Sequence, residues 1–118
     1  MKIETFEDVL SWQKAMGLNK KIYTSFRACK DFSFKDQVQR ASVSIMNNIA
    51  EGFERYSANE LVRFLYIAKG SCGETRSMVL LAFELGYISK EEKVEYLNLT
   101  QEISKLIYGL IKAQRKDA

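Results

Sequence analysis

The chain has 118 residues, of which 47% are hydrophobic and 28% are charged, and it contains no proline and no histidine. This length is enough for one domain with its own core, and the absence of proline favours an all-α fold with long helices. The formal net charge is only +3, so binding to nucleic acid would depend on local clusters of Lys and Arg. Cys29 and Cys72 match no metal-ligand spacing, so we expect no metal site and no cofactor.

The first expected helix covers about residues 6–29. Thr5 can cap it, and the acidic residues of its first turn suit the positive end of the helix dipole. Lys14 and Lys21 lie opposite an apolar face, which is typical of a helix packed on one side. The amino-terminal segment is too acidic for a secretory signal, and no apolar run has membrane-spanning length. We therefore expect a cytoplasmic protein without a membrane partner.

The second expected helix, about residues 34–52, carries three kinds of side chain on three sides, with Ser33 and Asp36 as a possible cap. One stripe is apolar and consists of Val38, Ala41, Ile45, Ile49 and Gly52. A polar seam follows the far side and consists of Arg40, Ser44, Asn47, Glu51 and Arg55. A second apolar strip lies between them and consists of Val43, Met46 and Ala50. Since a surface helix needs only one apolar face, the second strip predicts that another chain covers it.

The third and fourth expected helices cover about residues 58–85 and 90–113. Ser57 and Ser89 each precede a Glu by three residues, which is typical of a capping box. The third helix also has a second apolar strip, formed by Ile67, Met78, Leu81 and Leu85, with Arg63 and Glu74 set into it. Gly70 and Gly73 cost about 1 kcal/mol each relative to alanine in mid-helix, which suggests a close helix crossing or the approach of another chain. The tail contains three basic residues, Lys112, Arg115 and Lys116. Cations are favourable at the negative C-terminal end of a helix dipole.

The sequence resembles the four-helix-bundle proteins encoded in intervening sequences of bacterial 23S ribosomal RNA genes, and the run Asn48–Gly52, NIAEG, is the most specific part. In the first helix the resemblance is carried by Phe6, Val9, Trp12, Lys14 and Ala15. In the second it is carried by Gln37, Arg40, Ala41, Ser44, Ile45 and Asn48–Gly52, and in the third by Arg63, Phe64, Leu65, Ala68, Gly70, Ser71 and Glu74. The resemblance implies an antiparallel up-down-up-down bundle that assembles into a homo-oligomer, commonly a pentameric barrel. Relatives of this family include accessory proteins of diversity-generating retroelements, which bind nucleic acid and a reverse transcriptase.

The leading hypothesis is a non-catalytic oligomer that binds the backbone of RNA or DNA through a basic surface. Its candidate contacts are Lys14, Lys20, Lys21, Arg27, Lys30, Arg40 and Arg55. The expected oligomer interface or polar seam comprises Arg40, Val43, Ser44, Met46, Asn47, Asn48, Ala50, Glu51, Arg63, Ile67, Glu74, Met78 and Leu81. Five such chains would carry a formal charge of about +15, enough to attract a polyanion.

Two other functions stay open at the level of sequence. The first is a protein-interaction scaffold with no role in nucleic-acid binding, because the doubled apolar strips serve either purpose. The second is an enzyme, in which acid–base chemistry would fall to Glu51, Glu54 or Glu74. A carboxylate site in a helical bundle normally uses Glu-x-x-His pairs, which a chain without histidine cannot form. We therefore expect no enzymatic activity.

Overall fold

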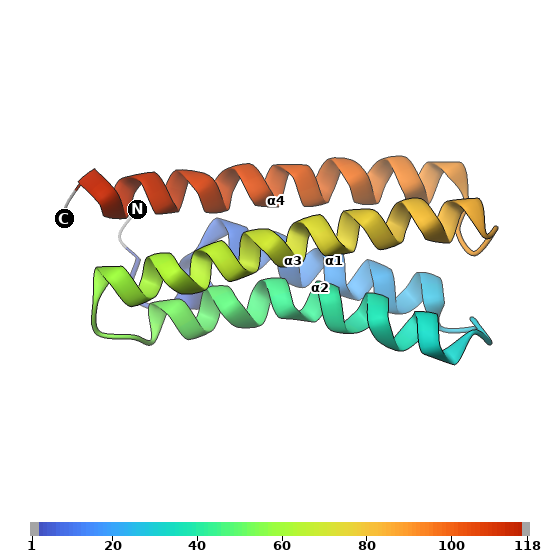
Figure 1. Ribbon diagram of the computed structural model, residues 1–118, viewed down its shortest axis with the longest axis horizontal. Coiled ribbons are helices and arrows are strands. Elements are labelled where there is room, and N and C mark those ends of the chain that lie inside the picture. The colour runs from blue at the N-terminus through green and yellow to red at the C-terminus, as the bar shows by residue number, and fades with distance from the viewer. Residues whose placement is uncertain (1–2, 117–118) are drawn as a thin grey trace.

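The computed structural model describes residues 3–116 and places them in four long α-helices and one short 3₁₀ turn (Figure 1). The elements are η1 (Phe6–Asp8), α1 (Leu10–Phe26), α2 (Phe32–Phe53), α3 (Ala58–Glu84) and α4 (Lys90–Lys116). The helices lie side by side in an elongated bundle that measures 46 × 22 × 21 Å. The all-α fold with four helices that the sequence predicts is confirmed.

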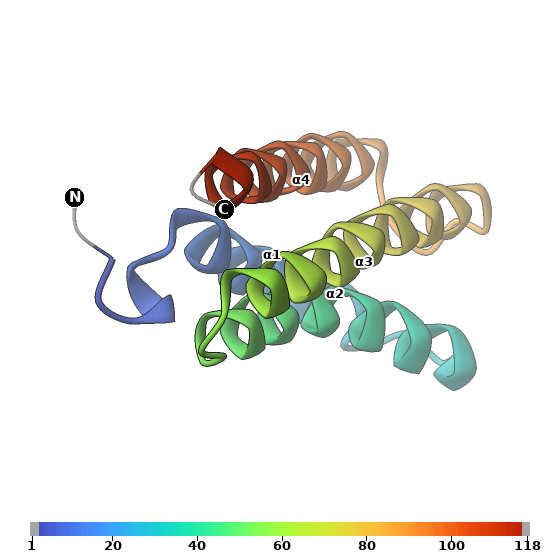
Figure 2. The same ribbon diagram turned by 60° about the vertical axis from the view of Figure 1, so that its left-hand side comes forward.

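The chain turns back at each of its three short connections, as the colours in Figures 1 and 2 show. Phe26 near the end of α1 contacts Phe34 near the start of α2, with ring centroids 5.8 Å apart. Helix α4 closes the bundle against α1 through an ion pair between Lys14 and Glu102. Helix α3 packs against both α2 and α4, so its exposed surface has one edge beside α2 and another beside α4.

The core consists of one apolar stripe from each long helix. Its fully buried aliphatic residues include Leu18, Ile22, Ile45, Ile49, Leu65, Val79, Ile103, Ile107 and Ile111. Thr75 and Thr100 are also fully buried, but each hydroxyl donates a 2.8 Å hydrogen bond to the carbonyl four residues earlier. The polar atoms of these threonines are thus satisfied within their own helices, and burial of apolar surface stabilises the bundle.

A buried pair of polar side chains links α1 to α2. Asn19 donates to the backbone carbonyls of Ala15, at 2.9 Å, and Ser42, at 3.1 Å. The Ser42 hydroxyl donates in return to Oδ1 of Asn19, at 2.7 Å. Because a buried amide without partners is costly, this pairing favours one register between the two helices.

The helix ends follow from local capping, with two departures from the expected elements. The expected first helix is divided at Val9, which is extended (φ −81°, ψ 122°) between η1 and α1. Helix α2 is capped by Asp31, whose carboxylate accepts from the Phe34 amide at 3.1 Å, and not by Ser33. Asp31 is the N-cap because it lies one position before the first helical residue, where a side-chain acceptor reaches the free amides of the first turn.

Helices α3 and α4 carry the side-chain caps that the sequence predicts, whereas the expected cap of the first helix by Thr5 is not formed at α1, whose N-cap is Val9 with no side-chain cap bond. Ser57 accepts a hydrogen bond from the Glu60 amide at 3.1 Å. Ser89 and Glu92 form both bonds of a capping box, at 3.1 Å and 2.8 Å. Helix α3 ends before Gly86, which adopts a φ of +77°, a conformation that favours glycine.

Candidate nucleic-acid interface

The lysines predicted on α1 face a row of carboxylates on α4. Lys14 pairs with Glu102 at 2.7 Å and Lys21 with Glu95 at 2.5 Å, and the bond to Glu95 raises the pKa of the Lys21 ammonium. The region has three other predicted cations, Lys20, Arg27 and Lys30. All three are exposed and form no ion pair within residues 3–116. Carboxylates of α4 therefore neutralise part of the positive charge on the α1 surface. A role of this surface in nucleic-acid binding stays a prediction.

The two predicted arginines of α2 both form ion pairs within that helix. Arg40 contacts Asp36 at 2.9 Å, and Arg55 contacts Glu51 at the same distance. The Arg55 guanidinium also lies 4.9 Å from the centroid of the Phe64 ring on α3. Exposed pairs at this spacing contribute only about 0.3–0.5 kcal/mol, so both arginines can exchange their partners for a phosphate at low cost.

Two residues of the expected interface or polar seam, Ser44 and Asn48, take part in a hydrogen-bond network between α2 and α3. Asn48 donates to the Ser44 hydroxyl at 2.9 Å, and that hydroxyl pairs with Ser71 on α3, also at 2.9 Å. These bonds join α2 to α3 and need no second chain. Asn47 and Glu51 are exposed beside them.

The remaining interface candidates lie on the outer faces of α2 and α3. Val43, Met46, Ala50 and Met78 are half-buried, and Arg63 and Glu74 are exposed. Arg63 pairs with Glu60 at 3.1 Å. Ile67 and Leu81 are 43% and 48% exposed, which is high for large aliphatic side chains along one face of a helix.

The α3 glycines are not explained by a helix crossing within the chain. Gly70 and Gly73 are exposed, and a Cβ atom added to either would meet no atom within 4 Å. Gly52 on α2 is different, because an added Cβ would lie 3.0 Å from Leu61 and 3.1 Å from Phe64. A close helix crossing within the chain therefore does not account for the α3 glycines, and the expected approach of another chain stays a prediction.

A second basic surface, which the sequence reasoning missed as a binding site, lies across α3 and α4. We call it the α3/α4 basic surface, and it consists of Tyr66, Lys69, Lys105, Tyr108, Lys112 and Arg115. A hollow of about 410 Å³ lies at its centre and is lined by Lys69, Ser104, Lys105, Tyr108, Gly109 and Lys112. None of its four cations forms an ion pair with a carboxylate of the described residues.

The signal that locates this surface is the charge distribution along the last helix. Glu91, Glu92, Glu95 and Glu102 all precede residue 103, whereas residues 103–116 contain no acidic residue. Residues 61–73 of α3 also lack acidic residues. Two adjacent segments without carboxylates therefore collect positive charge, although the whole chain carries only +3. The side chain of the tail residue Lys116 lies outside the described part of the structure.

A network of hydroxyl groups and a carboxylate joins α1 to the start of α4. Ser25 bonds to both Glu92 and the Tyr96 hydroxyl. The hydrogen bond from Ser25 and the amide of Ser89 lower the pKa of Glu92, while burial raises the pKa of Tyr96. A carboxylate with a lowered pKa is a weak base, so the arrangement suits helix docking better than activation of Ser25.

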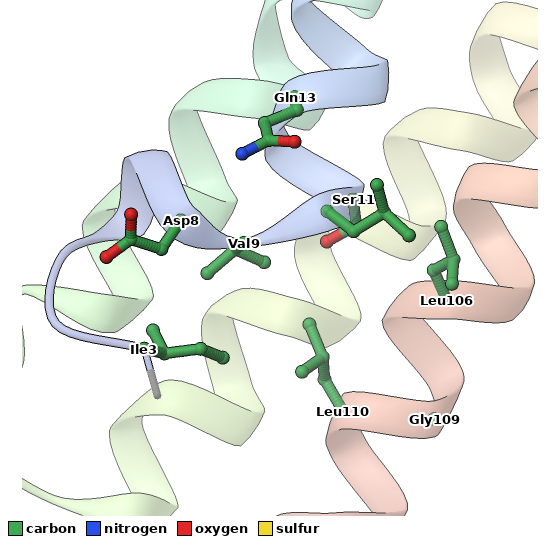
Figure 3. A pocket seen from close by; sticks show the side chains of 9 residues that line it. Ile3, Asp8, Val9, Ser11, Gln13, Leu106, Gly109 and Leu110 are labelled. Atoms are coloured by element: carbon green, nitrogen blue, oxygen red, sulfur yellow. The ribbon is translucent and has the colours of Figure 1, made fainter. Parts of the chain in front are cut away.

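An apolar hollow of about 430 Å³ separates the segment before α1 from α4 (Figure 3). Val9, Leu106 and Leu110 line it together with Ser11, whose Oγ is buried and has no hydrogen-bond partner. The carboxylate at its rim, Asp8, accepts from the backbone amides of residues 4 and 5. The hollow thus has an apolar lining and no acid–base pair of its own.

Residues 3–116 contain neither a metal-binding cluster nor a membrane-spanning helix. No three His, Cys, Asp or Glu side chains are placed to hold a metal ion. No helix in this range is both long and apolar enough to cross a membrane.

Residues 7–109 match the family model described as 23S rRNA-intervening sequence protein. The chain belongs to this family. The resemblance that the sequence indicates is therefore confirmed. The fold is similar to a crystal structure of a protein with unknown function from the S23 ribosomal protein family of Bacteroides thetaiotaomicron. That similarity has a TM-score of 0.81 at 27% sequence identity and covers 87% of this chain and 99% of that chain. A comparison with curated proteins finds no match.

Proposed function

We propose that this family member is a non-catalytic oligomer that binds the backbone of a nucleic acid in the cytoplasm. The observation that carries the proposal is the uncompensated charge of the α3/α4 basic surface. Lys69, Lys105, Lys112 and Arg115 gather across two helices, and the segments around them contain no acidic residue. Phosphate groups are the polyanion that such a surface attracts, with an affinity that falls steeply as salt rises.

The same proposal includes a homo-oligomer of antiparallel up-down-up-down bundles, with five subunits as the family resemblance implies. Support comes from the outer face of α3, where Ile67 and Leu81 are exposed and where Gly70, on the same side of the helix as Leu81, could carry a Cβ that meets no atom within 4 Å. Aliphatic side chains next to glycine allow a second helix to approach closely. Each added subunit also adds another basic surface, which strengthens binding to one long polyanion.

The alternative is a protein-interaction scaffold with no role in nucleic-acid binding. Leu80 and Leu85 favour it, because both remain exposed near the C-terminal end of α3, roughly 20 Å or more along the helix from Tyr66. Exposed aliphatic side chains suit a protein partner.

Fluorescence anisotropy of the purified oligomer tests the proposal. Structured RNA, single-stranded RNA and duplex DNA are each titrated at low and near-physiological salt. We expect binding of at least one of them at low salt, with a marked loss at higher salt. Lys69→Gln combined with Lys105→Gln should weaken that binding, while Lys14→Gln combined with Lys21→Gln, a change of equal charge on α1, should weaken it less. If none of the three binds at low salt, the proposal is wrong and the scaffold function replaces it.

A further inference from the structure

We infer that the α3/α4 basic surface binds a single-stranded nucleic acid, whose bases stack on Tyr66 and Tyr108 while its phosphates contact the surrounding cations. The inference rests on the proposed function and goes beyond it in naming the strand state and the contact residues. It starts from the two tyrosine rings, which are 42% and 44% exposed although both lie on packed helices.

Each of the two rings is paired with a cation of the same surface. Lys112 Nζ lies 5.2 Å from the centroid of the Tyr108 ring. The Arg115 guanidinium lies 5.4 Å from the centroid of the Tyr66 ring, across the gap between α4 and α3. Because each cation lies over its ring, a base that stacks on that face would displace the cation, which then becomes available for the phosphate of the same nucleotide. This alternation of aromatic ring and cation is the arrangement by which proteins hold single strands without reading their sequence.

The hollow between the helices completes the site. Lys69 from α3 faces Lys105, Tyr108 and Lys112 from α4 across it, and Gly109 leaves its floor without a side chain. A base must be unpaired and unstacked before it can lie on a tyrosine ring. A duplex offers only its phosphates to this surface and cannot use the rings. The geometry therefore favours a single strand over a duplex.

The negative end of the α4 dipole does not account for the whole cluster. The dipole favours cations only within about the last helical turn. It therefore accounts for the position of Arg115 and contributes to that of Lys112. Lys105 lies eleven residues before the end of α4, and Lys69 belongs to another helix.

The surface is separate from the aliphatic part of the proposed subunit interface, but it borders the α3 glycines. Tyr66 and Ile67 are neighbours in sequence, but they project about 100° apart around the helix. Tyr66 contacts the α4 residue Arg115, whereas Ile67 belongs to the face of α3 towards α2. A strand on Tyr66 therefore leaves Ile67 free for a neighbouring subunit, whereas Gly70 and Gly73, four and seven residues after Tyr66, lie beside the strand on the same stripe of α3.

The test measures binding of the full-length protein to one fluorescent 20-nucleotide sequence in three forms: single-stranded RNA, single-stranded DNA and duplex DNA. Tyr66→Leu/Tyr108→Leu removes both rings, Tyr66→Phe/Tyr108→Phe keeps them, and Tyr23→Leu changes an equally exposed tyrosine on α1. We expect the Leu pair to weaken single-strand binding at least about fivefold, with duplex binding unchanged. The Phe pair and Tyr23→Leu should bind as the wild type does. Tighter binding to RNA than to DNA would identify RNA as the ligand, and the reverse would identify DNA.

Two outcomes overturn the inference, and they are distinguishable from failure of the proposed function. If the Leu pair binds single strands as tightly as the wild type, the rings do not stack on bases. If the duplex binds more tightly than the single strands, the surface recognises only a backbone. In both cases nucleic-acid binding itself stands. If the wild type binds none of the three nucleic acids, both the proposed function and the inference are wrong.

Discussion

Replacing both α3 glycines by alanine should change the stability of the protomer and that of the oligomer in opposite directions. Neither added Cβ meets an atom of its own chain within 4 Å, so the protomer experiences only the change in helix propensity. This amounts to about 1 kcal/mol for each position, or about 2 kcal/mol for Gly70→Ala/Gly73→Ala. If a second chain approaches this face closely, the two methyl groups should overpack the contact at a cost of about 1–3 kcal/mol.

Sedimentation velocity over a range of protein concentrations measures the oligomer, and urea unfolding at the lowest concentration measures the protomer. We expect a higher urea midpoint and a dissociation constant raised at least about tenfold, which corresponds to 1.4 kcal/mol. Gly17→Ala on α1, where an added Cβ also meets nothing, is the control that should raise the midpoint without affecting assembly. An unchanged oligomer would show that α3 does not use its glycines for a subunit contact. A lower protomer midpoint would refute the propensity argument itself.

Three further predictions concern the bundle. Gly52→Ala should lower the unfolding free energy by about 1 kcal/mol in urea titrations, because the new Cβ would lie 3.1 Å from Cβ of Phe64 and overpacking outweighs the propensity gain. Since the hydrogen bond from Ser25 lowers the pKa of Glu92 below its ordinary 4.5, its contribution to stability is present above that pH and lost as pH falls through the lowered pKa. Acid unfolding of Glu92→Gln should therefore depend less on pH. Burial raises the pKa of Cys72 to about 12, so maleimide should label it only in denaturant.

The sequence predicts the fold well because local signals and the apolar pattern agree. The Ser89–Glu92 capping box forms as its spacing indicates, and the stripe that contains Ile45 and Ile49 is fully buried. The division at Val9 was not predicted, because no Gly or Pro marks it and a single β-branched residue lowers helix propensity only slightly; in the structure η1 packs against α1 and α2. Tertiary packing overrides helix propensity at such a point.

The charged site was harder to predict from sequence than the core. Lys14 and Lys21 form a regular basic face in sequence, but their partners on α4 follow about 75 to 90 residues later, and helical periodicity does not say which helices become neighbours. The α3/α4 basic surface could not be predicted for the same reason, because Lys69 and Lys112 are 43 residues apart and lie on different helices. Charge segregation along the last helix was visible in the sequence, but its meaning depended on the cations that α3 contributes.

The salt dependence of single-strand binding tests the central claim most directly. Each phosphate contact with a single strand contributes about −0.7 to the slope of log K against log salt concentration. The four cations of one α3/α4 basic surface should therefore give a slope of about −3. Replacing Lys69, Lys105 and Lys112 by glutamine should make this slope shallower by about 2 units. Binding with this slope, reduced in the triple variant, is the result that we predict. A wild-type slope near zero, or an equal slope in the triple variant, would contradict the claim that this surface holds the backbone.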